Sequence, residues 1–132
     1  MTPSVCNLLF CSSSPRDAEM SETLITGRGI RIERIVSLGH ASPVGFWYEQ
    51  EEAEWVMVLA GRARLTIEGE SEDRVLEPGV AAFLPPRCRH RVAWTDPVHP
   101  TIWLALYIGP ELKPSAAGPM FHSEFKENTG SR

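Results

Sequence analysis

The sequence predicts an all-β protein of one domain, built as an antiparallel sandwich or a small barrel. Short stretches rich in apolar and β-branched residues recur along the chain. Turn-forming pairs separate them, among them Pro78-Gly79, Pro85-Pro86 and Asp96-Pro97. No stretch carries a convincing run of apolar residues at helical spacing. Many short strands with turns of this kind are typical of sandwiches and barrels.

The strands expected in the first half of the chain differ in character. Ile30–Ser37 alternates in part, and residues 46–50 begin with three aromatic residues. Residues 55–60 follow an acidic patch and are apolar on both faces, as expected for a strand inside a closed or double-layered sheet. Ala63–Ile67 alternates apolar with polar residues, which is the period of a half-buried strand.

The second half of the chain continues the same pattern. Residues 68–71 have the composition of a turn. Four further strands are expected after it, over residues 74–77, 80–84, 91–95 and 101–108. We divide the chain into a loose N-terminal arm or edge strand (1–22), a β-barrel (23–110) and a C-terminal tail (111–132), because the first segment is rich in Ser, Pro and Thr and the last carries Pro, Gly and a polar end.

Composition limits the partners and the compartment. The chain has 132 residues, and its net charge of −4 argues against nucleic acid and anionic membrane as partners. The longest apolar run is too short to span a bilayer. The start of the chain lacks a basic stretch followed by an apolar one, and three cysteines without a regular framework favour a reducing compartment. We therefore expect a cytoplasmic protein.

Two segments about 30 residues apart carry the most specific pattern. In the first, Glu54 is followed by six residues and then Gly61. In the second, Gly79 is followed by five residues and Pro85, and His90 lies five residues further along. Each segment places one metal-ligand type of side chain, a carboxylate or an imidazole, on a strand-like stretch next to a turn. This spacing closely resembles the two motifs of the cupin superfamily.

The resemblance implies a jelly-roll β-barrel and covers roughly residues 25–108. It extends to a group of small single-domain bacterial cupins, some of which are labelled by analogy as mannose-6-phosphate isomerase-like. Two positions depart from the pattern: Arg87 stands where glycine is usual, and Trp94 where asparagine is usual. Because alternate residues of a strand share one face, a barrel of this type would bring Glu54 and His90 together in its lumen.

The resemblance also implies a divalent metal, but the ligand pattern departs from the family. Members that bind a metal usually carry a His-x-His pair three or four residues before the glutamate, and no histidine stands there in this chain. The remaining donors would suit Mn, Fe, Ni or Zn. Whether the third ligand comes from residue 49 or 50 stays open, because a bulge at the acidic patch would change which faces inward. The candidate metal ligands are Glu49, Gln50, Glu54 and His90.

Three further residues are candidates for the wall of the pocket. Tyr48 lies close to the proposed ligands, and Cys88 shares strand parity with His90. Trp94 also lies on the expected face of His90, where it would make the cavity less polar and offer a stacking surface. Arginines cluster beside His90 at positions 87, 89 and 91, and a functional role for them would be the capture of a carboxylate or phosphate.

The expected function is the binding of a small sugar-like or anionic molecule in the lumen, with Glu54 and His90 as catalytic residues. A metal held there would act as a Lewis acid in an isomerase, epimerase or oxygenase reaction, and the sequence leaves open whether the protein is an enzyme. Without a metal, the same pair could act as an acid and a base. The alternative is a non-catalytic binding or sensor module that has lost the histidine pair. We also expect a homodimer, with residues 8–10 and Thr101–Ile108 as the contact.

Overall fold

The structure, a computed structural model, describes residues 1–11, 15 and 17–116. These residues contain no helix and form eight strands, which confirms the predicted all-β class. The strands are β1 (Met20–Gly27), β2 (Ile30–Ser37), β3 (Ala53–Ala60), β4 (Ala63–Ile67), β5 (Arg74–Leu76), β6 (Ala81–Leu84), β7 (His90–Thr95) and β8 (Thr101–Ile108).

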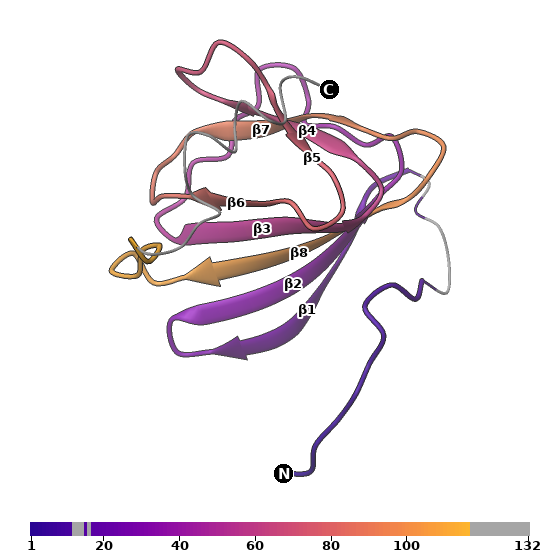
Figure 1. Cartoon of the computed structure of the whole chain (residues 1–132), viewed down its shortest axis with the longest axis vertical. Helices are drawn as coiled ribbons and strands as arrows, with labels where there is room; N and C mark the ends of the chain where they lie inside the picture. Colours follow the sequence, from indigo (N-terminus) through magenta and orange to yellow (C-terminus); the bar gives the residue numbers. More distant parts are fainter. Residues whose placement is uncertain (12–14, 16, 117–132) are drawn as a thin grey trace.

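The strands form two antiparallel sheets, as expected for a jelly roll. The larger sheet has the order β1-β2-β8-β3-β6, and the smaller has the order β5-β4-β7. Figure 1 shows the smaller sheet facing the β3–β6 side of the larger sheet, whereas β1 and β2 extend away from it. The larger sheet therefore has one half covered by the smaller sheet and one half that is more open.

The core lies between the sheets and follows from the apolar sequence of β3. Strand β3 lies inside the larger sheet, with both of its edges paired, to β6 and to β8, and its outer face (Trp55, Met57 and Leu59) is half-buried. Its inner residues Val56 and Val58 are buried, next to Trp103 and Ala105 of β8. The buried cluster consists of Val56, Val58, Ala63, Leu65, Leu76, Leu84, Trp103 and Ala105.

The β3–β4 turn depends on Gly61. Its φ is 83°, which favours glycine, and a Cβ added there would lie 2.5 Å from the Cα of Thr101. No L-residue with a side chain fits that approach without a backbone shift. The glycine of the first motif therefore makes the hairpin turn that its spacing predicts.

Two predicted elements differ in extent from the structure. Strand β1 begins at Met20, inside the segment expected to be a loose arm or an edge strand, and it is the edge strand of the larger sheet. Nearly all of its residues are exposed, so its sequence lacks a clear alternation. Residues 46–50 do not form a full strand: Tyr48 makes a single antiparallel bridge to His90. Of the predicted tail, residues 117–132 lie outside the described part of the chain.

Candidate functional site

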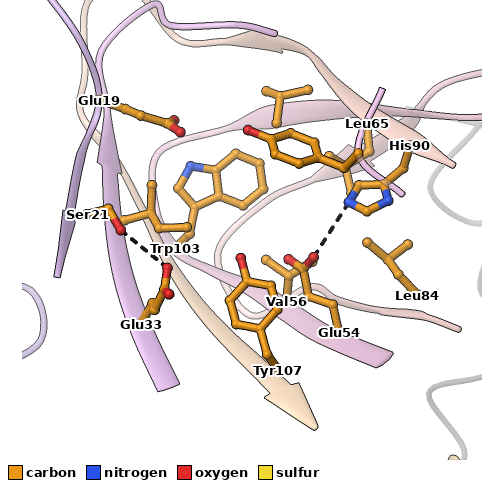
Figure 2. Close-up of a pocket in the computed structure, with 13 residues that line it drawn as sticks. Glu19, Ser21, Glu33, Glu54, Val56, Leu65, Leu84, His90, Trp103 and Tyr107 are labelled. Carbon is orange, nitrogen blue, oxygen red and sulfur yellow. Dashed lines mark hydrogen bonds and ion pairs between the residues drawn. The ribbon is translucent and has the colours of Figure 1, made fainter. Parts of the chain in front are cut away.

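A cavity of about 250 Å³ lies between the two sheets. Figure 2 shows side chains from both ends of the cavity pointing into a shared space. Its walls combine carboxylates, aromatic rings and aliphatic side chains. The thirteen lining residues are Glu19, Ser21, Glu33, Ile35, Tyr48, Glu54, Val56, Leu65, Leu84, His90, Val92, Trp103 and Tyr107.

Glu54 and His90 meet at one end of the cavity. Glu54 lies near the start of β3, between Leu84 of β6 and Tyr107 of β8, and is 7% exposed. His90 is the first residue of β7 and is 5% exposed. The imidazole Nε2 lies 3.5 Å from the carboxylate Oε1, within ion-pair reach (Figure 2). Residues 36 positions apart in sequence thus form one buried pair.

Two neighbours, Gln50 and Tyr48, hold this pair in place. The side-chain amide of Gln50 donates a hydrogen bond to the same Glu54 oxygen, at 3.0 Å. The ring of Tyr48 stacks on that of His90, with centroids 5.4 Å apart. The backbones of these two residues also exchange hydrogen bonds of 2.7 and 3.1 Å, which fixes the point where β7 begins. Both rings and the carboxylate are therefore positioned by backbone pairing rather than by side-chain contacts alone.

The tautomer of His90 follows from its second ring nitrogen. Nδ1 lies 2.9 Å from the carbonyl oxygen of Cys88, which can only accept, so Nδ1 carries a proton. In a neutral ring Nε2 would then turn its lone pair toward the Glu54 carboxylate. Burial lowers the pKa of His90, but the hydrogen bonds to Glu54 and to the Cys88 carbonyl outweigh it, and the pKa is raised. The carboxylate and the imidazole thus form a buried acid–base pair, with Oε1 3.5 Å from Nε2.

Two tyrosines line the cavity as neutral donors. Burial raises the pKa of Tyr107, and the nearby Glu54 and Glu33 carboxylates raise it further. Burial likewise raises the pKa of Tyr48, with Glu19 and Glu54 adding to the effect. Their hydroxyls keep their protons near neutral pH, so the rings contribute polar donors and aromatic faces but no charge.

The opposite end of the cavity comes from the N-terminal edge of the larger sheet, and we call it the N-terminal rim (Glu19, Ser21 and Glu33). Ser21 donates to Glu33 at 3.3 Å, and Ser37 donates to Glu19 at 3.0 Å. The Ser37 hydroxyl in turn accepts from the indole N–H of Trp103, at 3.1 Å. Glu19 and Ser21 are exposed, so solvent reaches the cavity from this side.

The structure brings some of the predicted site residues together and leaves others apart. Glu54, His90, Gln50 and Tyr48 form one cluster. The Glu49 side chain is instead 55% exposed, with a carboxylate oxygen 3.9 Å from Nε of Arg89. Alternation along residues 48–50 explains this, because Tyr48 and Gln50 face the site and the residue between them faces outward. Glu49 is therefore not in the same space as the other candidate metal ligands.

Cys88 and Trp94 do not line the cavity either. Cys88 packs against the core cluster, and burial raises the pKa of its thiol, with Glu70 and Glu54 adding to the effect, so it is not a thiolate. Its contribution is its carbonyl. Trp94 was expected on the face of His90, but the β4–β7 pairing shifts register between Arg64 and Leu65. That bulge turns Trp94 toward the exposed Arg64, whose guanidinium lies 5.1 Å from the ring centroid.

The arginine cluster also lies outside the cavity. Arg87 pairs with Glu51 at 3.1 Å, and Arg89 pairs with Glu68 at 2.6 Å. Arg91 donates to the carbonyl of Ser42. None of the three is among the lining residues. The predicted capture of an anion by these side chains therefore has no counterpart in the lumen.

Sequence reasoning missed the N-terminal rim and Tyr107. Glu33 shares an inward face with Ile35, which alternation along β2 does predict once the register is known. Ser21 lies on the same side of the sheet as Glu33, but the register of β1 shifts between Thr23 and Ile25. The sequence of an exposed strand gives no sign of such a bulge. Tyr107 follows from alternation with Trp103 and Ala105 on β8, a signal present in the sequence but not used.

The described fold and the Glu54–His90 pair define a cupin-type lumen. A family model, the cupin domain, matches residues 38–107. With 70 of 132 residues matched, the chain belongs to the cupin family. This confirms the predicted resemblance. A comparison with curated proteins gives no match.

Solved structures support the same assignment. A candidate mannose-6-phosphate isomerase from Ralstonia eutropha JMP134 is 44% identical, with a TM-score of 0.78, over 81% of this chain and 99% of that one. A protein from Thermus thermophilus is 18% identical, with a TM-score of 0.66, over 80% and 96% of the two chains. A cupin superfamily protein from Desulfitobacterium hafniense DCB-2 is 14% identical, with a TM-score of 0.61, over 74% and 83%. The last two share the fold. Among the described residues, no helix is long and apolar enough to cross a membrane.

Proposed function

We propose that this cupin binds a small organic molecule in its lumen and that Glu54 and His90 move a proton on it, as in an isomerase or epimerase. The observation that carries the proposal is the buried pair itself, with Nε2 and Oε1 3.5 Å apart at the wall of a 250 Å³ cavity. A carboxylate and an imidazole in contact can exchange the roles of acid and base during a reaction. The similarity to a candidate sugar-phosphate isomerase supports the same reaction class.

The roles of the two groups follow from their contacts. Oε1 of Glu54 accepts a hydrogen bond from Gln50 and lies next to His90. Oε2 has no hydrogen bond to a described residue, and it is the atom that would act as the base. His90, anchored through Nδ1, presents Nε2–H as the acid. The hydroxyl of Tyr107 lies beside Glu54 on the neighbouring strand and is a further neutral donor to a substrate oxygen (Figure 2).

The proposed reaction uses no metal. Among residues 1–11, 15 and 17–116, no group of three or more His, Cys, Asp or Glu side chains is arranged to hold an ion. The predicted set reduces to Glu54 and His90, with Gln50 as a weaker amide donor, because Glu49 faces outward. Two strong ligands do not fit the usual three-ligand site. Elemental analysis after incubation with Mn, Fe, Ni or Zn tests this: one ion per chain, lost in His90→Ala, would restore the predicted metal.

Solvent deuterium exchange tests the proton transfer. The protein is incubated in D₂O with neutral sugars, amino sugars, sugar phosphates and 2-hydroxy acids, and loss of the C–H signal next to the carbonyl or hydroxyl is followed by proton NMR. Exchange with one substrate, lost in Glu54→Gln and His90→Gln but kept in the outward Glu49→Gln, supports the proposal. Binding without exchange in every case would contradict it and would favour the non-catalytic binding module.

The predicted homodimer stays a proposal of its own. Strand β8 lies between β2 and β3, so both of its edges are paired and only its outer face could make a contact. The carbonyls of Leu8 and Phe10 are bound by Arg34, while the Phe10 side chain is 66% exposed. Light scattering across a concentration series tests the dimer, and a monomer at high concentration would exclude it.

A further inference from the structure

We propose that the natural ligand of the lumen is a small organic cation, an ammonium-bearing molecule held between the aromatic walls and the carboxylates of the N-terminal rim. The inference rests on the proposed function, because it names the substrate class of the same cavity. It is carried by the charge and the aromatic content of the lining.

The lining carries more negative than positive charge. Three of the thirteen lining residues are glutamates, at positions 19, 33 and 54, and none is lysine or arginine. One oxygen of Glu33 is bound by Arg31 at 2.7 Å, but Arg31 also lies 3.5 Å from Glu52 and does not line the cavity. Glu19 is held by a neutral hydroxyl, that of Ser37. Even with a charged His90 facing Glu54, the lumen keeps an excess negative charge.

The aromatic walls suit a cation as well. The lining includes the rings of Trp103, Tyr48 and Tyr107, and the two tyrosines are neutral donors as described above. Trp103 is 4% exposed and is fixed by its hydrogen bond to Ser37. Aromatic faces attract an ammonium group through their quadrupole, most strongly where water is excluded. In Figure 2, the Trp103 indole lies between the carboxylates of Glu19 and Glu33.

Size and charge exclude other ligand classes to different degrees. Pockets for drug-sized ligands hold about 300–1,000 Å³, so a cavity of 250 Å³ suits a molecule of metabolite size. A phosphate or carboxylate group on the ligand would face the three glutamates with no basic lining residue except His90, which is paired with Glu54, and this is unfavourable in a low-dielectric site. A neutral polyol could bond to the same carboxylates, but its binding would not depend on their charge. A loss of affinity when a lining glutamate is neutralised therefore distinguishes a cationic ligand from a neutral polyol.

Calorimetric titration with two molecules of the same shape tests the inference. Choline carries a quaternary ammonium, and 3,3-dimethyl-1-butanol replaces that nitrogen with carbon. We expect choline to bind about tenfold or more tightly than the alcohol. We expect Glu19→Gln to weaken choline binding about fivefold and to leave the alcohol unchanged. Glu51→Gln removes the same charge from a side chain that is 78% exposed and outside the lining, and should change neither.

The outcomes separate this inference from the proposed function. The inference of a cationic ligand would be overturned if choline and the alcohol bound equally, or if an anion such as glucose 6-phosphate bound more tightly. It would also be overturned if neither Glu19→Gln nor Glu33→Gln changed choline binding. None of these results touches the deuterium exchange assigned to Glu54 and His90. Conversely, choline binding that depends on Glu19, with no exchange on any ammonium-bearing substrate, would support the ligand class and contradict the reaction. Melting temperatures of the glutamine variants confirm that each is folded.

Discussion

The two ends of the lumen are built in different ways. The motif end comes from β3, β6 and β7 and holds Glu54 and His90, each less than a tenth exposed and fixed by pairing on both sides. The N-terminal rim comes from the segment before β1 and from β1 and β2, where Glu19 and Ser21 are exposed. We infer that the motif end provides the chemistry and that the rim selects the ligand. Changes at the motif end should therefore cost stability, and changes at the rim should mainly cost binding.

The largest difference is expected at two glycines. Gly61 and Gly29 both have positive φ, 83° and 75°. A Cβ at Gly61 would overlap the backbone of Thr101 at 2.5 Å, whereas a Cβ at Gly29, in the β1–β2 turn, meets nothing within 4 Å. We expect Gly61→Ala to lower the free energy of unfolding by about 4 kcal/mol or more. Gly29→Ala should lower it by about 1 kcal/mol, the ordinary cost of left-handed backbone. Urea denaturation measures both, and equal losses would remove the contrast.

The next largest difference concerns the charged groups. His90→Ala leaves the Glu54 carboxylate buried with Gln50 as its remaining described partner, and we expect a loss of about 3 kcal/mol in the free energy of unfolding. Glu19→Ala removes an exposed side chain bonded to one hydroxyl, and its loss should stay below about 1 kcal/mol. Chemical denaturation of both variants at one pH checks the ratio. A larger loss in Glu19→Ala would place the critical pairing at the rim.

The pH dependence of stability should come from the motif end. The pKa of His90 is raised in the folded protein from its ordinary 6.5, so its contribution to stability is fully present below that unfolded value and is lost as the pH rises through the folded pKa. We expect the free energy of unfolding to fall across that window in the wild type, and the fall to shrink in His90→Gln. NMR titration of the imidazole gives the folded pKa directly. A value below 6.5 would contradict the pairing with Glu54.

The smallest expected effect lies at the connection between the two ends. Trp103→Phe keeps the aromatic ring in the core but removes the indole N–H that donates to Ser37. We expect a loss of about 2 kcal/mol in the free energy of unfolding, from one buried hydrogen bond and from the space left by the smaller ring. Glu49→Gln, on the outer surface, is the matched control and should change stability by less than about 0.5 kcal/mol.

The same contrast explains how much the sequence could predict. The spacing of Glu54 with Gly61, and of Gly79 with His90, identified the motif end because a hairpin turn and a strand start fix both side chains relative to the barrel. The rim is not marked by any spacing. Its residues reach the cavity through the pairing of β1 with β2, whose register shifts between Thr23 and Ile25. Tertiary packing determines where such a bulge forms, and the bulge determines which side chains face the cavity. The local sequence does not reveal either.

Trp94 shows the same limit from the other side. Its parity with His90 in the sequence is correct, but the irregularity in the β4–β7 ladder falls between the two residues and reverses the face. For a related reason the sequence leaves open which of Glu49 and Gln50 faces inward; in the structure Gln50 bonds Glu54, whereas the Glu49 side chain is 55% exposed. The positions of Glu54 and His90, which lie within the motifs, were predictable from the sequence. The positions of residues separated from a motif by a bulge, such as Trp94, were not.

The hydroxyl of Ser37 has a consequence for observing this protein. It accepts from the indole of Trp103 and donates to Glu19, so one buried oxygen links a fluorophore in the core to a carboxylate at the entrance. A ligand that neutralises the Glu19 carboxylate would change the electric field at the indole through the Ser37 hydroxyl, and would shift the emission of Trp103. Subtracting the spectrum of Trp103→Phe isolates that signal from the other three tryptophans. We therefore expect the fluorescence of Trp103 to report whether a ligand occupies the cavity next to Glu19.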